Sequence, residues 1–128
     1  MKKSNDKYRE KLTAEAYKVC RLAFTEAPFS GKYNDHWLTG SYYCICCDLP
    51  LFSSKNKFNA GCGWPSFFAA IENNVIEKTD NSHGMQRIEI LCAHCQSHLG
   101  HVFNDGPEPT GLRYCVNSLS LLFKARGC

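Results

Sequence analysis

The most informative segment of the chain reads Leu112-Arg113-Tyr114-Cys115-Val116-Asn117-Ser118. It contains neither glycine nor proline, carries Tyr and Val, and alternates polar with apolar positions, a pattern typical of a short β-strand. Every second side chain of a strand shares a face, so we expect Arg113, Cys115 and Asn117 together on one side. Tyr114 and Val116 then face the core.

Cys115 has two interpretations. A guanidinium and an amide on its own face favour the thiolate, which is the reactive form of cysteine. Free cysteine is also among the most buried residue types, so a structural role is the alternative. The other motifs of the chain bear on this choice.

Length and composition indicate one globular domain spanning residues 1–128. The chain has 128 residues, enough for a modest core, and its 44% hydrophobic and 12% aromatic content argue against disorder. Its formal charge of +3 is spread along the chain, so no nucleic-acid partner is expected. Residues 1–11 are mostly charged or polar, which predicts a disordered or loosely ordered start and no secretory signal. No apolar run approaches the roughly 18 residues of a membrane span, so we expect a cytoplasmic protein with no membrane partner.

Nine cysteines, an odd number, need an explanation other than a disulfide framework in such a protein. Two CxxC pairs provide it: Cys44 with Cys47, and Cys92 with Cys95. Each pair follows a β-type run, as in a zinc knuckle, and four thiolates complete a tetrahedral zinc site. The 44 residues between Cys47 and Cys92 predict a metal that joins two distant hairpins. Unrelated free cysteines are the alternative, and Cys46 is left outside the site.

A rival ligand set stands at successive steps of three residues: Cys92, Cys95, His98 and His101. The ten residues from Cys92 to His101 would then have to curl tightly around one ion. The first CxxC pair would also go unused, so we prefer the site made from both pairs.

The sequence predicts a short N-terminal helix followed by a mainly β body. Good helix formers run from Thr13 to about Phe24, and Thr13 can cap the first turn. Beyond Gly40, short β-type runs alternate with turns, which favours an all-β sandwich or barrel. These runs are Ser41–Cys44, Leu49–Phe52, Val75–Lys78, Arg87–Leu91, Leu99–Phe103, Leu112–Val116 and Leu119–Phe123.

Two histidines precede the Cys115 strand by a short distance. In an unbroken strand His98 and His101 would point to opposite faces, but a bulge at Gly100 would give them a shared face. Two imidazoles would then be available as proton donors near neutral pH. The turn-rich loop that follows could bring Asp105 within reach of them. A structural role is the alternative for either histidine.

A second informative loop reads Ala60-Gly61-Cys62-Gly63-Trp64-Pro65-Ser66-Phe67-Phe68. Glycines on both sides of Cys62 make its backbone mobile, which suits a resolving cysteine that must travel to a sulfenic acid. Trp64, held by Pro65 and with Phe67 behind it, could form one wall of an apolar substrate pocket. Core packing is the alternative for these aromatic residues and is favoured for Phe67 or Phe68, so Trp64 is the better candidate for the pocket.

Together these segments resemble the B-type methionine sulfoxide reductases, from about Leu12 to Phe123. The likeness rests on the CxxC pair before P-L-F-S-S and on three longer segments: K-F-N-A-G-C-G-W-P-S-F, C-A-H-C-Q-S-H-L-G-H-V-F-N-D-G-P and P-T-G-L-R-Y-C-V-N-S. It implies a mainly β fold of two antiparallel, tent-like sheets, with a structural zinc held by the four paired cysteines.

The resemblance also implies an activity, that of a peptide-methionine (R)-S-oxide reductase, an oxidoreductase of protein repair under oxidative stress. Cys115 would attack the sulfoxide and become a sulfenic acid, and Cys62 would resolve it to an intramolecular disulfide. Thioredoxin would then reduce the disulfide by exchange. The partners implied are oxidised proteins and thioredoxin, and the enzyme is expected to be a monomer.

The resemblance carries over residue by residue to the rest of the site. Trp64 would contact the substrate methyl group, and the remaining catalytic positions would be His98, His101, Asp105, Arg113 and Asn117. Beside Trp64 we also expect Phe67 to contribute to substrate binding, although the resemblance does not imply this. Cys20, Cys46 and Cys128 fall outside the family pattern. Cys128, near the end of the chain, leaves the identity of the resolving thiol open.

Two other function classes compete with this one. A zinc-stapled β module could bind a protein or nucleic acid without chemistry, but it has no need of a thiolate between Arg113 and Asn117. A zinc hydrolase or deaminase would use the histidines, but neither H-E-x-x-H nor H-x-E before a CxxC is present.

Overall fold

The computed structural model describes residues 12–125, which contain one α-helix and nine β-strands. The first eleven residues, expected to be loosely ordered, and Cys128, the possible rival resolving thiol, lie outside the described residues. No helix within residues 12–125 has the length and apolar character needed to cross a lipid bilayer.

Helix α2 (Ala14–Leu22) begins where the sequence predicts. Thr13 caps it, because its hydroxyl oxygen accepts a hydrogen bond of 3.1 Å from the backbone N–H of Ala16. The helix ends two residues earlier than expected, since Ala23 takes a left-handed conformation with a φ of 60°. Its buried face, which includes Cys20, packs against strand β7 and the turn before β9.

The strands form two sheets that are antiparallel throughout, which confirms the expected fold class. The smaller sheet has the order β2 (Pro50–Ser53), β1 (Gly40–Cys44), β9 (Leu121–Ala125). The larger sheet has the order β3 (Lys57–Phe58), β4 (Ser66–Phe67), β8 (Arg113–Val116), β7 (His98–Phe103), β6 (Arg87–Cys92), β5 (Val75–Asp80).

The strands differ from the predicted runs in two places. Strand β9 begins at Leu121, because Ser118–Ser120 forms a 3-10 turn instead of continuing the extended chain. Strands β3 and β4 were not predicted. Each has only two residues, too few for an alternating pattern to be recognised in sequence.

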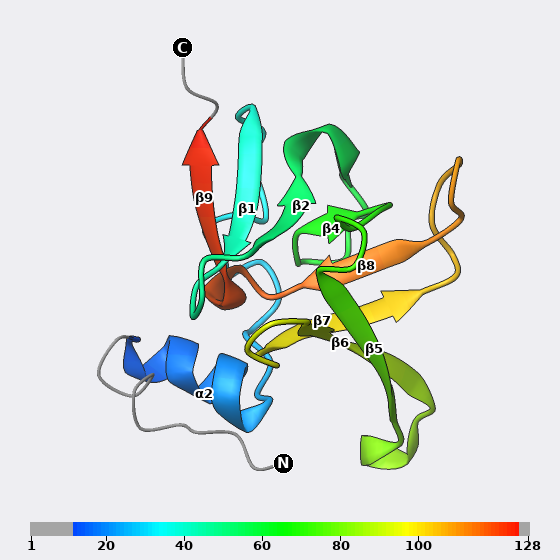
Figure 1. The fold of residues 1–128 in the computed structure, drawn as a ribbon. Helices are drawn as coiled ribbons and strands as arrows, with labels where there is room; N and C mark the ends of the chain where they lie inside the picture. The colour runs from blue at the N-terminus through cyan, green and yellow to red at the C-terminus, as the bar shows by residue number, and fades with distance from the viewer. Residues whose placement is uncertain (1–11, 126–128) are drawn as a thin grey trace.

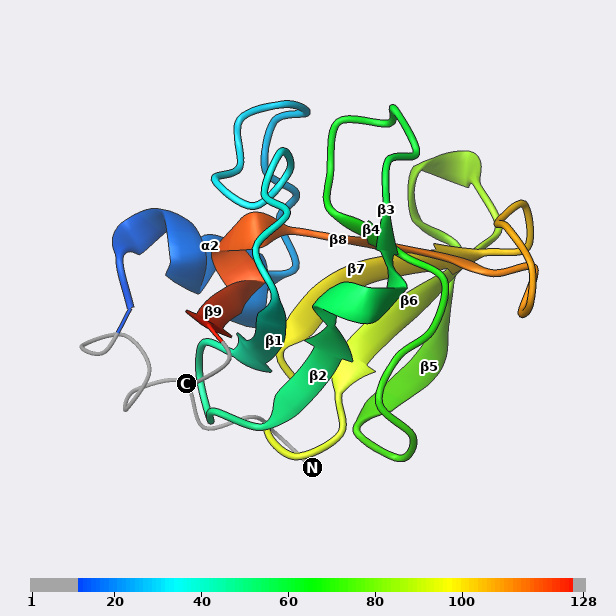
Figure 2. The ribbon, with the colours of Figure 1, turned by 90° about the horizontal axis from the view of Figure 1, so that it is seen from above.

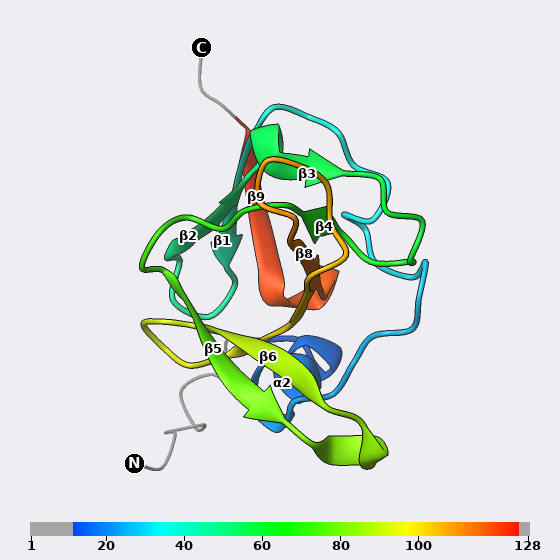
Figure 3. The same cartoon turned by 90° about the vertical axis from the view of Figure 1, so that its right-hand side faces the viewer.

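The two sheets enclose one core, and the order of strands places β8 inside the larger sheet. Figure 1 shows the three-stranded sheet beside the larger one, with α2 below. In the view from above, β8 and β7 run side by side from the helix towards the far loop (Figure 2). In Figure 3 the hairpin of β5 and β6 makes the lower part of the molecule. The core is filled by large side chains from both sheets: Tyr42, Leu51, Phe52, Phe67, Ile90, Leu99, Val116 and Leu121.

Candidate active site

Cys115 lies on β8, between two neighbouring strands. It pairs with Ser66 of β4 on one side and with His101 of β7 on the other. The backbone N–H of Val116 donates a 3.0 Å hydrogen bond to the carbonyl oxygen of Pro65, which holds the strand against the loop that carries Trp64. The thiol is therefore mounted on a strand that is paired on both sides at Cys115.

Strand β7 carries no side chain where it passes β8 most closely. Gly100 pairs with Val116, and a Cβ at Gly100 would collide with the carbonyl oxygen of Cys115. Only glycine permits this close approach of two backbones. Gly100 also lines the space next to the thiol, so its missing side chain helps to open that space.

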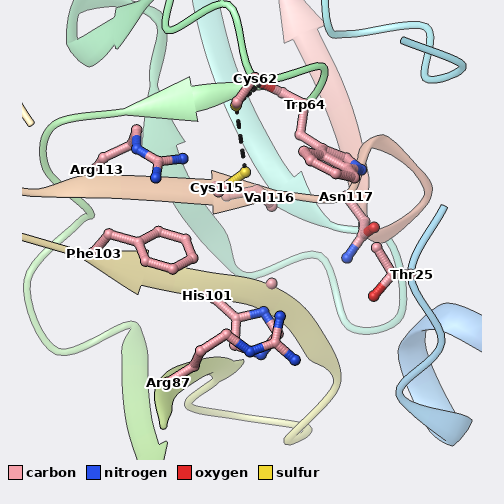
Figure 4. Close-up of a pocket in the computed structure, with 11 residues that line it drawn as sticks. Thr25, Cys62, Trp64, Arg87, His101, Phe103, Arg113, Cys115, Val116 and Asn117 are labelled. Atoms are coloured by element: carbon pink, nitrogen blue, oxygen red, sulfur yellow. Dashed lines mark hydrogen bonds between the residues drawn. The ribbon is translucent and has the colours of Figure 1, made fainter. Parts of the chain in front are cut away.

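A pocket of about 280 Å³, called the thiol pocket below, opens at Cys115. Figure 4 shows Trp64 on one side of the thiol, Arg113 and Phe103 on the other, and His101 below it. The pocket is lined by Thr25, Cys62, Trp64, Arg87, Gly100, His101, Phe103, Arg113, Cys115, Val116 and Asn117. Most of the residues assigned to the site from sequence thus meet in one cavity.

Cys62 brings a second thiol into the thiol pocket. Its Sγ lies 3.6 Å from Sγ of Cys115 and 3.3 Å from the hydroxyl oxygen of Ser66 (Figure 4 marks the first contact). The loop takes positive φ angles on both sides of Cys62, 71° at Gly61 and 98° at Gly63. These left-handed angles explain why glycine flanks the cysteine.

The two thiols differ in pKa. Burial raises the pKa of Cys115, and the nearby thiol of Cys62 raises it further, while the guanidinium of Arg113 lowers it. Burial also raises the pKa of Cys62, but hydrogen bonds with Ser66 and with the backbone of Trp64 lower it overall. The surroundings of Cys115 thus raise the pKa of its thiol in the reduced pair, whereas the sequence led us to expect that they favour its thiolate.

His98 and His101 lie together, as expected, because β7 contains a bulge. The register between β6 and β7 shifts between Ile90 and Leu91, which leaves Leu99 as an extra residue on β7. The bulged residue, Leu99, lies directly before Gly100, the position where the bulge was expected. The two imidazole centroids are 5.7 Å apart.

Each histidine is paired with a carboxylate that the sequence did not single out. His98 Nδ1 lies 2.6 Å from Glu89 Oε2, and His101 Nε2 lies 2.8 Å from Asp80 Oδ2. Burial lowers the pKa of His101, with Arg87 acting in the same direction and the hydrogen bond to Asp80 opposing both. The hydrogen bond to His101 holds the pKa of Asp80 well below its usual range. Of the two histidines, His101 lines the thiol pocket.

Asp105 does not approach the histidines, contrary to expectation. Its carboxylate accepts two hydrogen bonds from Arg113, at 2.9 Å from Nε and 3.2 Å from Nη2, and its side chain is 63% exposed. The pair lowers the pKa of Asp105 and raises that of Arg113. The guanidinium also lies over the ring of Phe103, 4.4 Å from its centroid. Asp105 therefore orients Arg113 towards the thiol pocket.

Trp64 and Asn117 are both fixed by the backbone of Glu26. Trp64 Nε1 donates to the carbonyl oxygen of Glu26 at 3.1 Å, and the N–H of Glu26 donates to Asn117 Oδ1 at 3.0 Å. Asn117 Nδ2 in turn donates to the carbonyl oxygen of Leu99 at 3.0 Å. These contacts set the position of two walls of the thiol pocket before any substrate arrives.

Phe67 is not part of the pocket wall. Its side chain is fully buried and stacks on Phe52 with ring centroids 4.4 Å apart. The register explains this, because Ser66 pairs with Cys115 and the next residue of β4 must face the opposite side of the sheet. The assignment of Phe67 to the substrate site is therefore wrong, and the core alternative holds.

The two CxxC pairs meet between the sheets, as the sequence predicts. Their four sulfur atoms all lie within 4.8 Å of one another, and the Cys44–Cys95 and Cys47–Cys92 Sγ distances are both 3.5 Å. A tetrahedral zinc with Zn–S bonds of about 2.3 Å needs sulfurs about 3.8 Å apart, so the donor set fits this ion. The contiguous rival set does not form, because both of its histidines are paired with carboxylates.

The two pairs sit in turns of the same construction. The N–H of Asp48 donates to the carbonyl oxygen of Cys44 at 2.8 Å, and the N–H of Gln96 donates to that of Cys92 at 2.9 Å. Asp48 and Gln96 both have left-handed backbones, with φ of 69° and 61°. One turn belongs to each sheet, so an ion bound there joins β1 to β6.

Sequence reasoning missed Glu26, Asp80, Arg87 and Glu89. A signal existed for two of them, because Arg87 and Glu89 alternate along one face of a predicted strand. Glu89 pairs in register with His101, which places a carboxylate beside the histidines. No local pattern marks Glu26, whose role comes from contacts far along the chain.

Comparison with known proteins agrees with the family resemblance of the sequence segments. The model of the SelR domain matches residues 12–125. A peptide methionine sulfoxide reductase MsrB of Pseudomonas putida (strain W619) is 60% identical over 125 residues, covering 97% of this chain and 94% of the relative. MsrB of Thioalkalivibrio sulfidiphilus (strain HL-EbGR7) is 58% identical, covering 95% of this chain and 90% of the relative. MsrB of Pseudomonas syringae pv. syringae (strain B728a) is also 58% identical, covering 94% of this chain and 93% of the relative.

Proposed function

Because the chain belongs to the SelR family and matches MsrB enzymes over nearly their whole length, we propose that it reduces methionine sulfoxide in proteins to methionine, acting on the R epimer. One observation carries the proposal. The thiols of Cys115 and Cys62 lie 3.6 Å apart in a pocket that has an indole on one wall and an imidazole on another.

The first step is attack of the Cys115 thiolate on the sulfoxide sulfur. Proton donation from the imidazolium of His101 to the sulfoxide oxygen neutralises the charge that develops there. The protonated sulfoxide oxygen then passes from the substrate sulfur to the sulfur of Cys115, so the S–O bond of the substrate breaks, methionine leaves with the two electrons supplied by Cys115, and Cys115 becomes a sulfenic acid. Trp64 accepts the small methyl group of the substrate, and the guanidinium of Arg113 favours the attacking thiolate.

The second step uses Cys62. Its thiolate attacks the sulfenic sulfur, a disulfide forms, and the oxygen leaves as water. The sulfurs must approach from 3.6 Å to about 2.0 Å, a movement that the glycines beside Cys62 allow. A dithiol of the thioredoxin class then restores both thiols by exchange.

The four paired cysteines are assigned to a structural zinc. Cys44, Cys47, Cys92 and Cys95 would hold it, and the bound ion would fix the smaller sheet to the larger one. The ion takes no part in the reduction, because the thiol pocket is built from other residues. The described cysteines are all free thiols, which suits a reducing compartment such as the cytoplasm. The groups that line the thiol pocket all come from one chain, so a monomer is sufficient for the proposed chemistry.

The test is an epimer-resolved assay with dithiothreitol as reductant. Peptides carrying the R or the S sulfoxide are incubated with the protein, and methionine is measured by chromatography. We expect methionine from the R peptide only, and none from either peptide with Cys115→Ser. If the folded parent protein releases methionine from neither epimer, the proposal fails and the chain is a zinc-stapled binding module.

A further inference from the structure

Glu26 is a buried acid in a loop of mostly exposed residues. Residues 25–31, called the clamp loop below, follow helix α2 in the chain and contact the loop that carries Cys62 and Trp64. Within this stretch, all of which the structure describes, Glu26 alone is buried, with an exposed fraction of 7%. Burial of a carboxyl group costs free energy unless its oxygens find partners, so its contacts show what it does.

The side chain of Glu26 ties the clamp loop to the turn after β8. Its Oε1 accepts a 3.0 Å hydrogen bond from the backbone N–H of Leu119. This turn, Ser118–Ser120, directly follows Asn117, whose Oδ1 accepts a 3.0 Å hydrogen bond from the backbone N–H of Glu26. Glu26 therefore holds the segment at the end of the Cys115 strand with two hydrogen bonds, one from its side chain and one from its backbone.

The other side of the clamp loop holds the loop that carries Trp64. The carbonyl oxygen of Glu26 accepts the 3.1 Å hydrogen bond from Trp64 Nε1, and the N–H of Phe29 donates a 2.7 Å hydrogen bond to the carbonyl oxygen of Gly63. The indole lies beside Cys115 as a wall of the thiol pocket (Figure 4). The position of this wall therefore depends on where the clamp loop lies.

We propose that Glu26 is a positioning residue that sets the size of the subsite for the S-alkyl group of the substrate. This inference rests on the proposed function, in which Trp64 accepts the substrate methyl group. The side chain of Glu26 is fixed at Leu119, and its backbone fixes the indole, so the wall keeps a constant distance from the sulfur of Cys115. A fixed wall fits a methyl group and rejects a larger alkyl group, whereas a wall that can move accepts both.

The contacts indicate that Glu26 acts through an acceptor oxygen and not through its charge. Burial raises the pKa of Glu26, and hydrogen bonds from residues 118 and 119 oppose this shift. Glutamine offers the same carbonyl acceptor on a side chain of the same length. Aspartate keeps the charge, but it is one methylene group too short to reach Leu119. The two substitutions therefore separate the position of the acceptor from the charge.

The test is a competition between two substrates in one vessel. A peptide carrying the R sulfoxide of methionine and a peptide carrying that of ethionine, its S-ethyl homologue, are mixed with the protein and dithiothreitol. Mass spectrometry measures the ratio of the two reduced products, which gives the ratio of the two kcat/KM values and does not depend on the amount of folded protein. We expect the parent to prefer the methyl substrate at least about tenfold, the scale for one misplaced methylene group.

The variants Glu26→Ala and Glu26→Asp should lower this preference to about threefold or less, while Glu26→Gln should keep most of it. Glu26→Asp is sufficient alone if Glu26→Ala does not fold. Thr13→Ala is the matched control, because it removes the cap of helix α2 and lowers stability without changing the clamp loop. A parental preference in Glu26→Asp, or a loss of preference that Glu26→Gln or Thr13→Ala shares, would overturn the proposal.

A second measurement separates failure of this proposal from failure of the proposed function. The chain has two tryptophans, so Trp37→Phe leaves the indole of Trp64 as the only one. In that background Glu26→Asp should shift the fluorescence emission to longer wavelength and increase quenching by acrylamide, while Glu26→Gln should do neither. This result does not depend on activity, so it stands even if the parent releases no methionine. Unchanged emission and quenching in Glu26→Asp would show that Glu26 does not position the indole.

Discussion

At the scale of single residues, the two cysteines of the thiol pocket are distinguished by their surroundings. Cys115 sits on a paired strand, where burial raises its pKa, while Cys62 sits on a glycine-flanked loop with a hydroxyl neighbour. In the reduced pair the pKa of Cys62 is therefore lowered, while that of Cys115 is raised. The proposed attack by Cys115 therefore requires its thiolate to form beside the second thiol of Cys62, which raises the pKa of Cys115.

The first prediction concerns this coupling. Cys62→Ser removes a thiol that raises the pKa of Cys115, so the pKa of Cys115 should fall. The measurement is the alkylation rate of Cys115 against pH, with the labelled peptide identified by mass spectrometry. Ser66→Ala is the matched variant. The hydrogen bond from Ser66 lowers the pKa of Cys62, so the pKa of Cys62 should rise when this bond is removed. An unchanged or higher pKa of Cys115 in Cys62→Ser would contradict this description of the pair.

The second prediction concerns the acid. Burial sets the pKa of His101 below its ordinary value of 6.5, while that of Cys115 lies above 9.0. The reactive form needs a protonated His101 and an ionised Cys115, so its population is constant between the two pKa values and falls below the first and above the second. In the Cys62→Ser background, the single-turnover rate should therefore show a broad plateau with pH.

The variant His101→Asn should change both the rate and the shape of this profile. The rate should fall about 100-fold, the usual scale for loss of a general acid. The rate of this variant should also rise about tenfold per pH unit across the former plateau, because it then depends only on the fraction of Cys115 present as thiolate. Asp80→Asn removes the hydrogen bond that raises the pKa of His101, so the acidic limb should move to lower pH. A plateau that survives His101→Asn would show that the imidazole is not the acid.

At the scale of elements, the strand pair of β7 and β8 organises the site. Its close approach depends on Gly100, and its bulge brings the two histidines together. The sequence was sufficient for the second feature, because H-L-G-H places a glycine where a bulge can give the two histidines a shared face, but it did not indicate the close approach of the two strands at Gly100. The sequence was insufficient for the short strand β4, whose pairing with β8 directs Phe67 into the core. It was also insufficient for the two carboxylates that pair with the histidines, Asp80 of β5 and Glu89 of β6.

These failures have a common physical cause. Alternation within one strand shows which residues share a face, but the partner across the sheet depends on register, which non-local packing decides. Asp105 illustrates the point, because its loop follows the histidines in sequence and yet bends back to Arg113. The CxxC pairs were easier to assign, because tetrahedral thiolate coordination requires four such ligands wherever they lie along the chain.

The third prediction tests the approach of the two strands. Gly100→Ala places a methyl group against the carbonyl oxygen of Cys115, so β7 and β8 must separate. We expect a loss of about 3 kcal/mol in the free energy of unfolding, at the upper end for overpacking, together with a loss of activity. Urea denaturation measures the first and the epimer assay measures the second.

Gly84→Ala is the comparison for this variant. Its added methyl group meets nothing within 4 Å, so only the left-handed backbone, with a φ of 68°, opposes it. The cost should be about 1 kcal/mol with activity retained. Equal stability and activity of Gly100→Ala and the parent would show that the strands do not need glycine at their closest point.

At the scale of the whole molecule, the four-cysteine cluster ties the two sheets together. Cys44 is the last residue of β1 and Cys47 lies in the turn after it, while Cys92 is the last residue of β6 and Cys95 lies in the turn after that strand. A domain of this size has a modest core, so a metal joining its two sheets contributes a large share of its stability. The thiol pocket lies on the larger sheet and is affected only through the fold.

The fourth prediction follows from the separation of the four-cysteine cluster from the thiol pocket. Cys92→Ser should abolish stoichiometric zinc and lower the thermal midpoint sharply, because structural zinc supplies roughly 10 kcal/mol or more of binding free energy. Elemental analysis and calorimetry measure the two effects, and Cys62→Ser should keep both zinc and stability. Full zinc in Cys44→Ser/Cys47→Ser, with none in His98→Ala/His101→Ala, would instead assign the ion to the contiguous set.

The most direct test of the central claim is a single turnover without reductant, comparing Cys115→Ser with Cys62→Ser. We predict no methionine from Cys115→Ser, because the attacking sulfur is gone. Cys62→Ser should release about one equivalent of methionine and leave a sulfenic acid on Cys115 that dimedone traps. Thioredoxin should then fail to support steady turnover, while a small thiol restores it. Methionine release by Cys115→Ser, or unchanged thioredoxin-driven turnover by Cys62→Ser, would contradict the assignment of the two cysteines.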